Sequence, residues 1–173
     1  MRAAIALSPE NVEIKLYSRL GNLPQFNPAL ELTQPPSVTD LRSQLRWPDG
    51  LLISTPEYAH GVPGVLKNAL DWLVSGSEFV GKPIALLDAS PRATHEIASL
   101  TEIVTVMNGR IIPEASICVP LQGKNLDSAA IASHPEISTV LQAAIVAFAK
   151  AIEHCQSEVA EDGSIASLNI RLC

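Results

Sequence analysis

Short apolar runs, each bounded by polar, proline or glycine residues, set the pattern of this chain. The run from Leu51 to Ile53 is apolar at every position and suits a strand buried on both faces, as in a parallel sheet. Two later runs have the length of a strand, although Pro113 lies near the start of the second. We therefore predict strands at 51–55, 84–89 and 111–119.

Helical patterns fall between and after these runs. The sequence Ser133-His134-Pro135-Glu136 fits a capping box with proline in the first turn, and apolar residues recur at helical spacing from there to Ile152. Ser37 and Thr94 are candidate caps of two further helices. Because strand and helix signals alternate, we predict an α/β sandwich. The two further helices are predicted at 38–45 and 94–107.

The segment between the first predicted strand and the next helical pattern is a stiff loop. The apolar run ends at Ser54 and Thr55, and the next nine residues contain two prolines and two glycines. Proline limits the freedom of the backbone, and glycine has no β-carbon, so a flat ligand can lie directly on main-chain amides. We predict that the loop from Pro56 to Gly64 contacts a ligand.

This loop and the helix after it closely resemble a motif of the NADPH-dependent FMN reductase family. The matching residues are Pro56-Glu57-Tyr58 and Leu66 to Trp72, and the resemblance continues through Gly81 to Ser90 and covers most of the chain. The family includes quinone, azo-dye and chromate reductases. The resemblance implies a flavodoxin-like three-layer α/β/α sandwich with a parallel sheet. It also implies that the Pro-Glu-Tyr loop lies against the FMN ring and that the helix helps to form a dimer.

The resemblance supplies the candidate cofactor-binding residues. Tyr58 is expected either to wall the ring or simply to pack. Glu57 is not expected to act as a base, because a carboxylate beside reduced, anionic flavin would be repulsive, so its backbone N–H is the expected contact. His60 is either a proton donor, since histidine titrates near neutrality, or a structural residue. Many members have Asn where this chain has Ala59. The predicted set is Pro56, Glu57, Tyr58, Ala59, His60, Gly61, Ser90 and Arg92, with no catalytic and no metal-binding residue.

A second candidate segment, residues 88–95, follows the next predicted strand. Ligands in open α/β sheets collect outside the carboxyl ends of the strands, so this loop is expected to face the same crevice. Family members often carry glycines here, whereas this chain has Arg92, Ala93 and Thr94. Ser90 is therefore the most direct carry-over. Arg92 either meets an NADPH phosphate through its guanidinium group or is a solvated loop residue.

The start of the sequence departs from the family pattern. The family opens with a strand and a Gly-Ser-x-Arg-x-x-Ser-type loop that holds the FMN phosphate, whereas residues 1–7 resemble the middle of the helix that follows that loop. Residues 12–17 then match the second strand of the family and 51–55 the third. In the order 2-1-3-4-5 the missing first strand lies between these two. Three explanations stay open: a start site assigned too far downstream, a truncated gene product, or a sheet in which strand two pairs directly with strand three.

Length and composition fit one domain, 1–173, in which 156–173 is a tail. The tail ends in an alternation of Leu168, Ile170 and Leu172 that also fits an edge strand. Hydrophobic residues make up 47% of the chain and aromatic residues only 4%, so the core must be mostly aliphatic. The net charge of −6 argues against a nucleic-acid partner, which would need a basic stripe.

Cysteine usage and apolar length indicate the compartment. The three cysteines are far apart and have no metal-ligand spacing, so we interpret them as ordinary thiols of a reducing cytoplasm, with Cys118 in the core. No segment is expected to approach the length of a membrane span. We therefore predict a cytoplasmic protein without a membrane partner.

The function that the resemblance implies is an FMN-dependent NAD(P)H oxidoreductase. Hydride would pass from NAD(P)H through bound flavin to a small acceptor such as FMN, a quinone, an azo compound or chromate. The cofactor carries the chemistry, which agrees with the lack of an acid–base constellation in the sequence. A homodimer or homotetramer is expected. Two alternatives stay open: a flavodoxin-type electron carrier, and a truncated, flavin-free scaffold paralogue.

Overall fold

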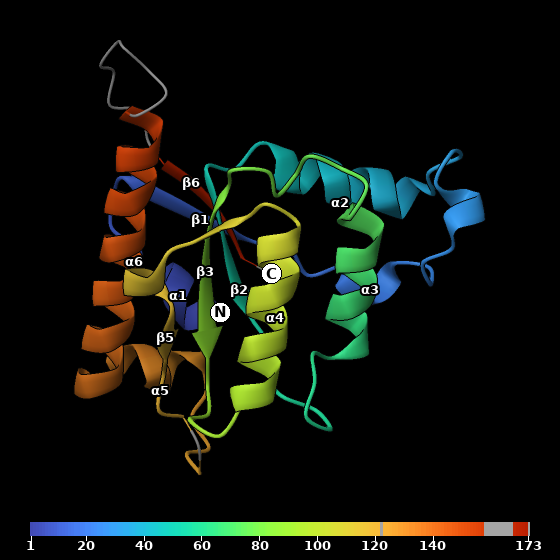
Figure 1. Cartoon of the computed structure of the whole chain (residues 1–173). Coiled ribbons are helices and arrows are strands. Elements are labelled where there is room, and N and C mark those ends of the chain that lie inside the picture. The colour runs from blue at the N-terminus through green and yellow to red at the C-terminus, as the bar shows by residue number, and fades with distance from the viewer. Residues whose placement is uncertain (122, 158–167, 173) are drawn as a thin grey trace.

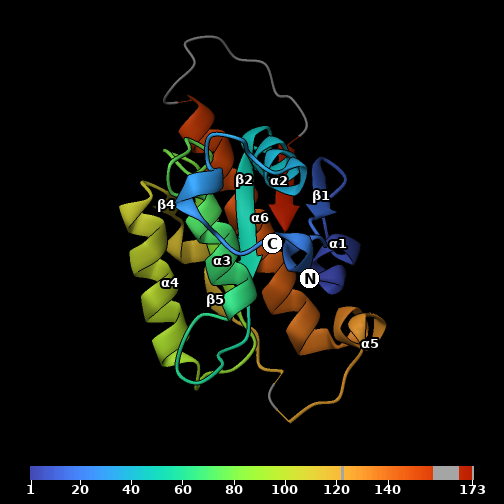
Figure 2. The same cartoon turned by 90° about the vertical axis from the view of Figure 1, so that its right-hand side faces the viewer.

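The strands form one parallel sheet. The computed structural model describes residues 1–121, 123–157 and 168–172. Within these residues the pairings between neighbouring strands of the sheet are parallel. Figure 2 shows the strands side by side, with β4 toward the left and β1 at the right. Their spatial order is β1 (Val12–Leu16), β6 (Leu168–Leu172), β2 (Gly50–Ser54), β3 (Pro83–Asp88) and β4 (Arg110–Ile111), and β5 (Ile117–Cys118) pairs with the carboxyl end of β3.

Helices cover both faces of this sheet, which confirms the three-layer α/β/α sandwich (Figure 1). One face packs against α1 (Arg2–Ala6), α5 (Ser128–Ser133) and α6 (Pro135–Ser157). The other face packs against α2 (Pro36–Arg46), α3 (Gly64–Leu73) and α4 (Thr94–Val106). Short 3-10 helices complete the described elements: η1 (Leu20–Asn22), η2 (Pro28–Leu30) and η3 (Pro113–Ala115).

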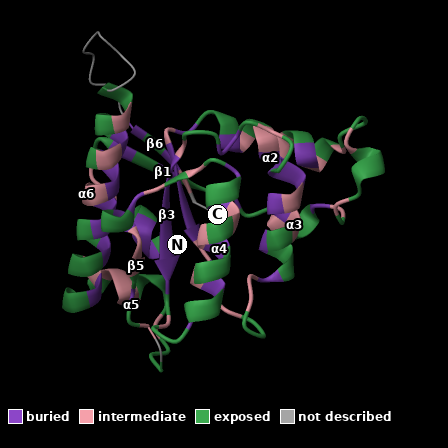
Figure 3. Ribbon diagram, in the orientation of Figure 1, coloured by how far each residue is buried: buried purple, intermediate pink, exposed green. Residues whose placement is uncertain are grey.

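The continuous apolar runs of β2 and β3 follow from this layering. In β2, Leu52 belongs to the hydrophobic cluster on the α6 side, whereas Leu51 and Ile53 belong to the cluster on the α3 side. A strand covered on both faces must be apolar at successive positions, because neighbouring side chains point to opposite faces. Figure 3 shows β3 buried along its length, as all six of its residues are. The prediction of buried parallel strands is confirmed here.

β6 occupies the centre of the sheet, between β1 and β2. It pairs with β1 from Val12↔Leu168 to Leu16↔Leu172 and with β2 from Gly50↔Ile170 to Leu52↔Leu172. It therefore stands where the family order places the first strand. As expected, α1 is the first described element, without the family's first strand before it, but β6 fills the place of that strand in the sheet. The expectations of a tail or edge strand and of direct pairing between strands two and three are wrong for these residues. Residues 158–167 and 173 of the expected tail lie outside the described residues.

The predicted strand 111–119 is wrong as one element. It divides into β4 and β5, with η3 between them beginning at Pro113. Proline has no N–H to donate to a ladder, so the interruption falls where the sequence is least suited to a strand. Cys118 at the end of β5 is exposed and not in the core as expected.

Two helices also depart from expectation. α5 was not predicted, and α6 is longer than expected, with 23 residues. By length and composition alone α6 is apolar enough to cross a membrane, so the expectation that no segment approaches that length is wrong. Its inner side chains, among them Ile145, Phe148 and Ile152, are buried in the cluster on this face of the sheet. The core position of α6 explains its apolar composition.

Candidate functional site

The loop after β2 contains a tight two-residue turn. The N–H of Tyr58 donates to the carbonyl oxygen of Gly61 at 3.2 Å, and the N–H of Gly61 donates to that of Tyr58 at 3.0 Å. Ala59 and His60 between them have φ values of 49° and 57°. This left-handed pair is typical of a mirror-image hairpin turn, which favours Asn or Gly and costs energy for other residues. The turn therefore holds Ala59 and His60 in a strained backbone conformation.

Glu57 joins this loop to the start of α4. Its Oε2 accepts hydrogen bonds from the backbone N–H groups of His95 and Glu96, each at 3.0 Å. Ala93, which directly precedes α4, provides no side-chain cap. Thr94, the expected cap, is instead the first residue of α4. Glu57 thus caps a helix that begins far along the sequence. The N–H groups of His95 and Glu96, with the Glu96 contact the largest cause, lower the pKa of the Glu57 carboxyl.

Two imidazole groups flank this carboxylate. Nδ1 of His60 lies 3.2 Å from Oε1 of Glu57. The rings of His60 and His95 meet edge to face, with centroids 4.5 Å apart. The side chain of His60 is 78% exposed, and Tyr58 is 67% exposed. His60 and Tyr58 were predicted from the sequence, but the contact of His60 with His95 was not, because residues 35 positions apart meet only through the fold.

The second loop follows β3 and lies beside the first. The N–H of Ser90 donates to Oδ1 of Asp88 at 2.9 Å, and the N–H of Arg92 donates to Oγ of Ser90 at 3.3 Å. Arg92 is exposed. Since Glu57 bonds to the helix that this loop enters, the structure brings both predicted segments together at the carboxyl ends of β2 and β3. Open α/β sheets bind ligands at this end of their strands, and a crevice shared by both loops was predicted there.

Glu96 is a buried acid that sequence analysis missed. The residue is fully buried, and neither of its carboxylate oxygens has a hydrogen-bond partner among the described residues. Burial, followed by the charges of Asp88 and Glu57, raises the pKa of Glu96 to about 7. A carboxyl group without a partner is easier to bury when it is neutral. Its position in the first turn of α4 had the pattern of an ordinary solvated acid, so the sequence carried no signal for it.

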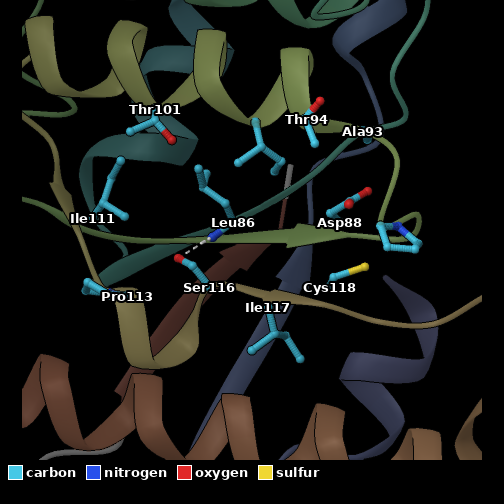
Figure 4. Close-up of a pocket in the computed structure, with 12 residues that line it drawn as sticks. Leu86, Asp88, Ala93, Thr94, Thr101, Ile111, Pro113, Ser116, Ile117 and Cys118 are labelled. Carbon is cyan, nitrogen blue, oxygen red and sulfur yellow. Dashed lines mark hydrogen bonds between the residues drawn. The ribbon is translucent and has the colours of Figure 1, made fainter.

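A cavity of about 550 Å³ lies between α4 and the strands β3, β4 and β5 (Figure 4). Asp88 and Cys118 lie at one end of the cavity. Desolvation, followed by the charge of Asp88, raises the pKa of the Cys118 thiol. The remaining lining is mostly apolar and includes Leu86, Ile97, Ile111, Pro113 and Ile117.

Helix α3, which carries the second part of the motif, makes several side-chain contacts within its own subunit. Trp72 is fully buried and donates its indole N–H to the carbonyl oxygen of Pro24 at 2.8 Å. The side chain of Asn68 accepts from the N–H of Phe26 and donates to the carbonyl oxygen of Pro24. The side chains of Asn68 and Trp72 are therefore bound within their own subunit. Lys67 and Asp71 form an ion pair at 2.6 Å on the exposed side.

The family of the chain is decided by its sequence match. The sequence model of the NADPH-dependent FMN reductase family matches residues 1–122. The chain belongs to this family. The predicted resemblance is thereby confirmed, and both loops of the candidate site lie within the matched residues.

Individual relatives agree with this assignment. An NAD(P)H-dependent FMN reductase of Pseudomonas aeruginosa is 42% identical over 93 residues, which are 52% of this chain and 50% of that protein. A quinone reductase of Escherichia coli K12 is 33% identical over 88 residues, or 49% and 47% of the two chains. The chain thus spans about half the length of the curated relatives it matches. A solved flavoenzyme NAD(P)H:(acceptor) oxidoreductase of Paracoccus denitrificans has a TM-score of 0.78 at 26% identity, covering 89% of this chain and 87% of that one.

The loop from Pro56 to Gly64 has room for a flat ring such as that of a flavin. A β-carbon on Gly64 would meet no atom within 4 Å, and one on Gly61 would meet only the carbonyl oxygen of Tyr58, at 3.9 Å. The loop therefore presents open backbone beside an exposed tyrosine, as a flat ring requires. In the family the phosphate loop joins the first strand to the first helix. Their counterparts by place in the fold are β6, which lies between β1 and β2, and α1, which packs on one face of the sheet.

Proposed function

We propose that this chain is an FMN-dependent NAD(P)H oxidoreductase that reduces a small acceptor. The observation that carries the proposal is the junction of two loops, after β2 and β3, through the hydrogen bonds of Glu57 to the first turn of α4. In a member of the NADPH-dependent FMN reductase family, these are the loops on which a flavin ring would lie. Bound FMN would supply hydride transfer, and the protein would position the reactants.

The proposed cofactor contacts divide between the two loops. The aromatic ring of Tyr58 would stack beside the flavin, and the open backbone near Gly61 would face its edge. In the second loop Ser90 would contact the ring, while the exposed guanidinium of Arg92 would meet a phosphate of NAD(P)H. The full proposed set is Pro56, Glu57, Tyr58, Ala59, His60, Gly61, Ser90 and Arg92.

Acceptor, assembly and compartment belong to the same proposal. FMN, quinones, azo compounds and chromate are the proposed acceptors, in line with the relatives named as FMN and quinone reductases. We propose a homodimer or homotetramer that uses the exposed side of α3, where Val65 is 47% exposed. We also propose a cytoplasmic location, which the free thiols of Cys118 and Cys155 support.

Two exposed aromatic residues provide a matched test. Tyr58 belongs to the candidate site at the carboxyl ends of the strands. Trp47, which is 82% exposed, precedes β2 and so lies toward the amino ends of the strands. We expect the Tyr58→Ser variant to bind FMN about fivefold more weakly than the unaltered chain, because a ring contact is lost. Quenching of flavin fluorescence measures this affinity. We expect Trp47→Ser to leave it unchanged.

The results separate the proposed function from its alternatives. An unaltered chain that quenches no FMN fluorescence would contradict the proposal and favour a flavin-free scaffold. A chain that binds FMN tightly but whose flavin is not reduced by NAD(P)H would favour an electron carrier. Equal weakening by Tyr58→Ser and Trp47→Ser would place the flavin elsewhere.

A further inference from the structure

We propose that Glu57 is a positioning residue whose carboxylate fixes the loop Pro56–Gly61 against the first turn of α4, so that both loops form one rigid platform for the flavin. This inference rests on the proposed function. It assigns to the Glu57 side chain a role that is distinct from the backbone contact expected from the sequence. The carboxylate would act through the loops that it joins and not on the reacting atoms.

The hydrogen-bond geometry supports a long-range cap. Oε2 of Glu57 receives the N–H groups of His95 and Glu96, which are the second and third residues of α4. These are the amides that a local cap residue normally satisfies. Ala93, in the cap position, has no side-chain group to offer them. α4 therefore depends on a residue from a different loop for its first-turn hydrogen bonds.

The second carboxylate oxygen faces the turn itself. Oε1 of Glu57 lies 3.2 Å from Nδ1 of His60, and His60 also contacts the ring of His95. One carboxylate thus connects the strained turn, through His60, with the helix, through the amides. Strained backbone persists only where its surroundings hold it in place. The Glu57 contacts, together with the ring contact between His60 and His95, tie the turn at Ala59 and His60 to α4.

A purely local capping role and a positioning role make different predictions. If Glu57 served only to stabilise α4, any residue that capped the helix would replace it. If it positions the loop, a new cap on the helix would restore the helix but not the platform. Ser is a favoured cap residue and is small enough for the buried position of Ala93. The Glu57→Ala and Ala93→Ser changes, alone and combined, therefore separate the two roles.

The first measurement uses the flavin-free protein. We expect Glu57→Ala to speed amide hydrogen exchange at His95 and Glu96 by about fivefold, which is the scale of a lost helix cap. The double variant Glu57→Ala with Ala93→Ser should recover the exchange protection of the unaltered chain. Unchanged exchange in Glu57→Ala would overturn the proposal, because it would show that the carboxylate does not hold these amides in solution.

The second measurement is FMN affinity by fluorescence quenching. We expect Glu57→Ala to bind FMN about fivefold more weakly, and we expect the double variant to stay as weak although its helix is capped again. Recovery of affinity in the double variant, or unchanged affinity in Glu57→Ala, would overturn the proposal. Ala93→Ser alone must bind as the unaltered chain does. Absence of FMN binding by the unaltered chain would instead contradict the proposed function, and that result is seen before any variant is compared.

Discussion

Ala59 stands where many family members have Asn, and its backbone conformation is one that alanine disfavours. Its φ of 49° lies in the left-handed region, where Asn is tolerated better than Ala because its side chain can hydrogen-bond locally. Its side chain is exposed, so a larger polar group has room. We expect Ala59→Asn to raise the free energy of unfolding by about 0.5 kcal/mol. Chemical denaturation measures this change. The β-branched variant Ala59→Val should lower the same quantity, and a gain in stability with Val would refute the argument.

Glu96 gives the protein a pH dependence of unusual sign. Its pKa is about 7 in the folded protein, above the ordinary value of 4.5, so the folded state binds the proton more tightly than the unfolded state. The stability from this group is present below pH 4.5 and is lost as the pH rises toward 7. We expect Glu96→Gln to raise the free energy of unfolding by about 1 kcal/mol at pH 8 and to change it little at pH 5. Urea denaturation of both proteins at the two pH values tests this, and an equal effect at both would contradict it.

At the scale of elements, Ser116 compensates for the break between β4 and β5. Its Oγ accepts from the N–H of Leu86 at 3.1 Å (Figure 4). The same hydroxyl donates to the carbonyl oxygen of Ile112 at 2.8 Å. We expect Ser116→Ala to lower the free energy of unfolding by about 1 to 3 kcal/mol, because a half-buried N–H of β3 loses its partner. Ser43→Ala, which removes an exposed hydroxyl on α2, should cost much less. Thermal denaturation compares the two, and equal costs would contradict this role.

The elements that the sequence predicts well are those whose pattern is local. The strand β2, the stiff loop after it and helix α3 follow from an apolar run, prolines and glycines, and a helical period within 25 residues. β5 and the cap of α4 do not, because they depend on Ser116 and Glu57 meeting distant backbone. The residues of the two loops were therefore predictable, but the hydrogen bonds that join the loops were not.

At the scale of the whole molecule, the central strand comes from the far end of the sequence. Leu168 and Ile170 are buried in the hydrophobic cluster on the α6 side of the sheet. The backbone N–H of Asn169 donates to Oδ2 of Asp49 at 2.8 Å. The alternation of these residues was visible in the sequence. The place of β6 between β1 and β2 was not visible, because spatial order in a parallel sheet is set by packing and not by chain order.

The central position of β6 has a measurable consequence for stability. We expect Ile170→Ala to lower the free energy of unfolding by about 2 to 5 kcal/mol, as for other fully buried aliphatic side chains. Val140→Ala, at a 41% exposed position of α6, should cost well under half as much. Chemical denaturation of both variants provides the comparison. A small cost for Ile170→Ala would show that residues 168–172 do not pack in the centre of the sheet.

The claim that this member of the NADPH-dependent FMN reductase family works as a flavin reductase is tested most directly by the visible spectrum of the protein. The 173-residue chain would be mixed with FMN, freed of excess by gel filtration, and treated with NAD(P)H in the absence of oxygen. We predict that flavin absorbance stays with the protein and is bleached by NAD(P)H. Folded protein that elutes without flavin would contradict the account. So would a protein whose bound flavin stays oxidised after NAD(P)H is added.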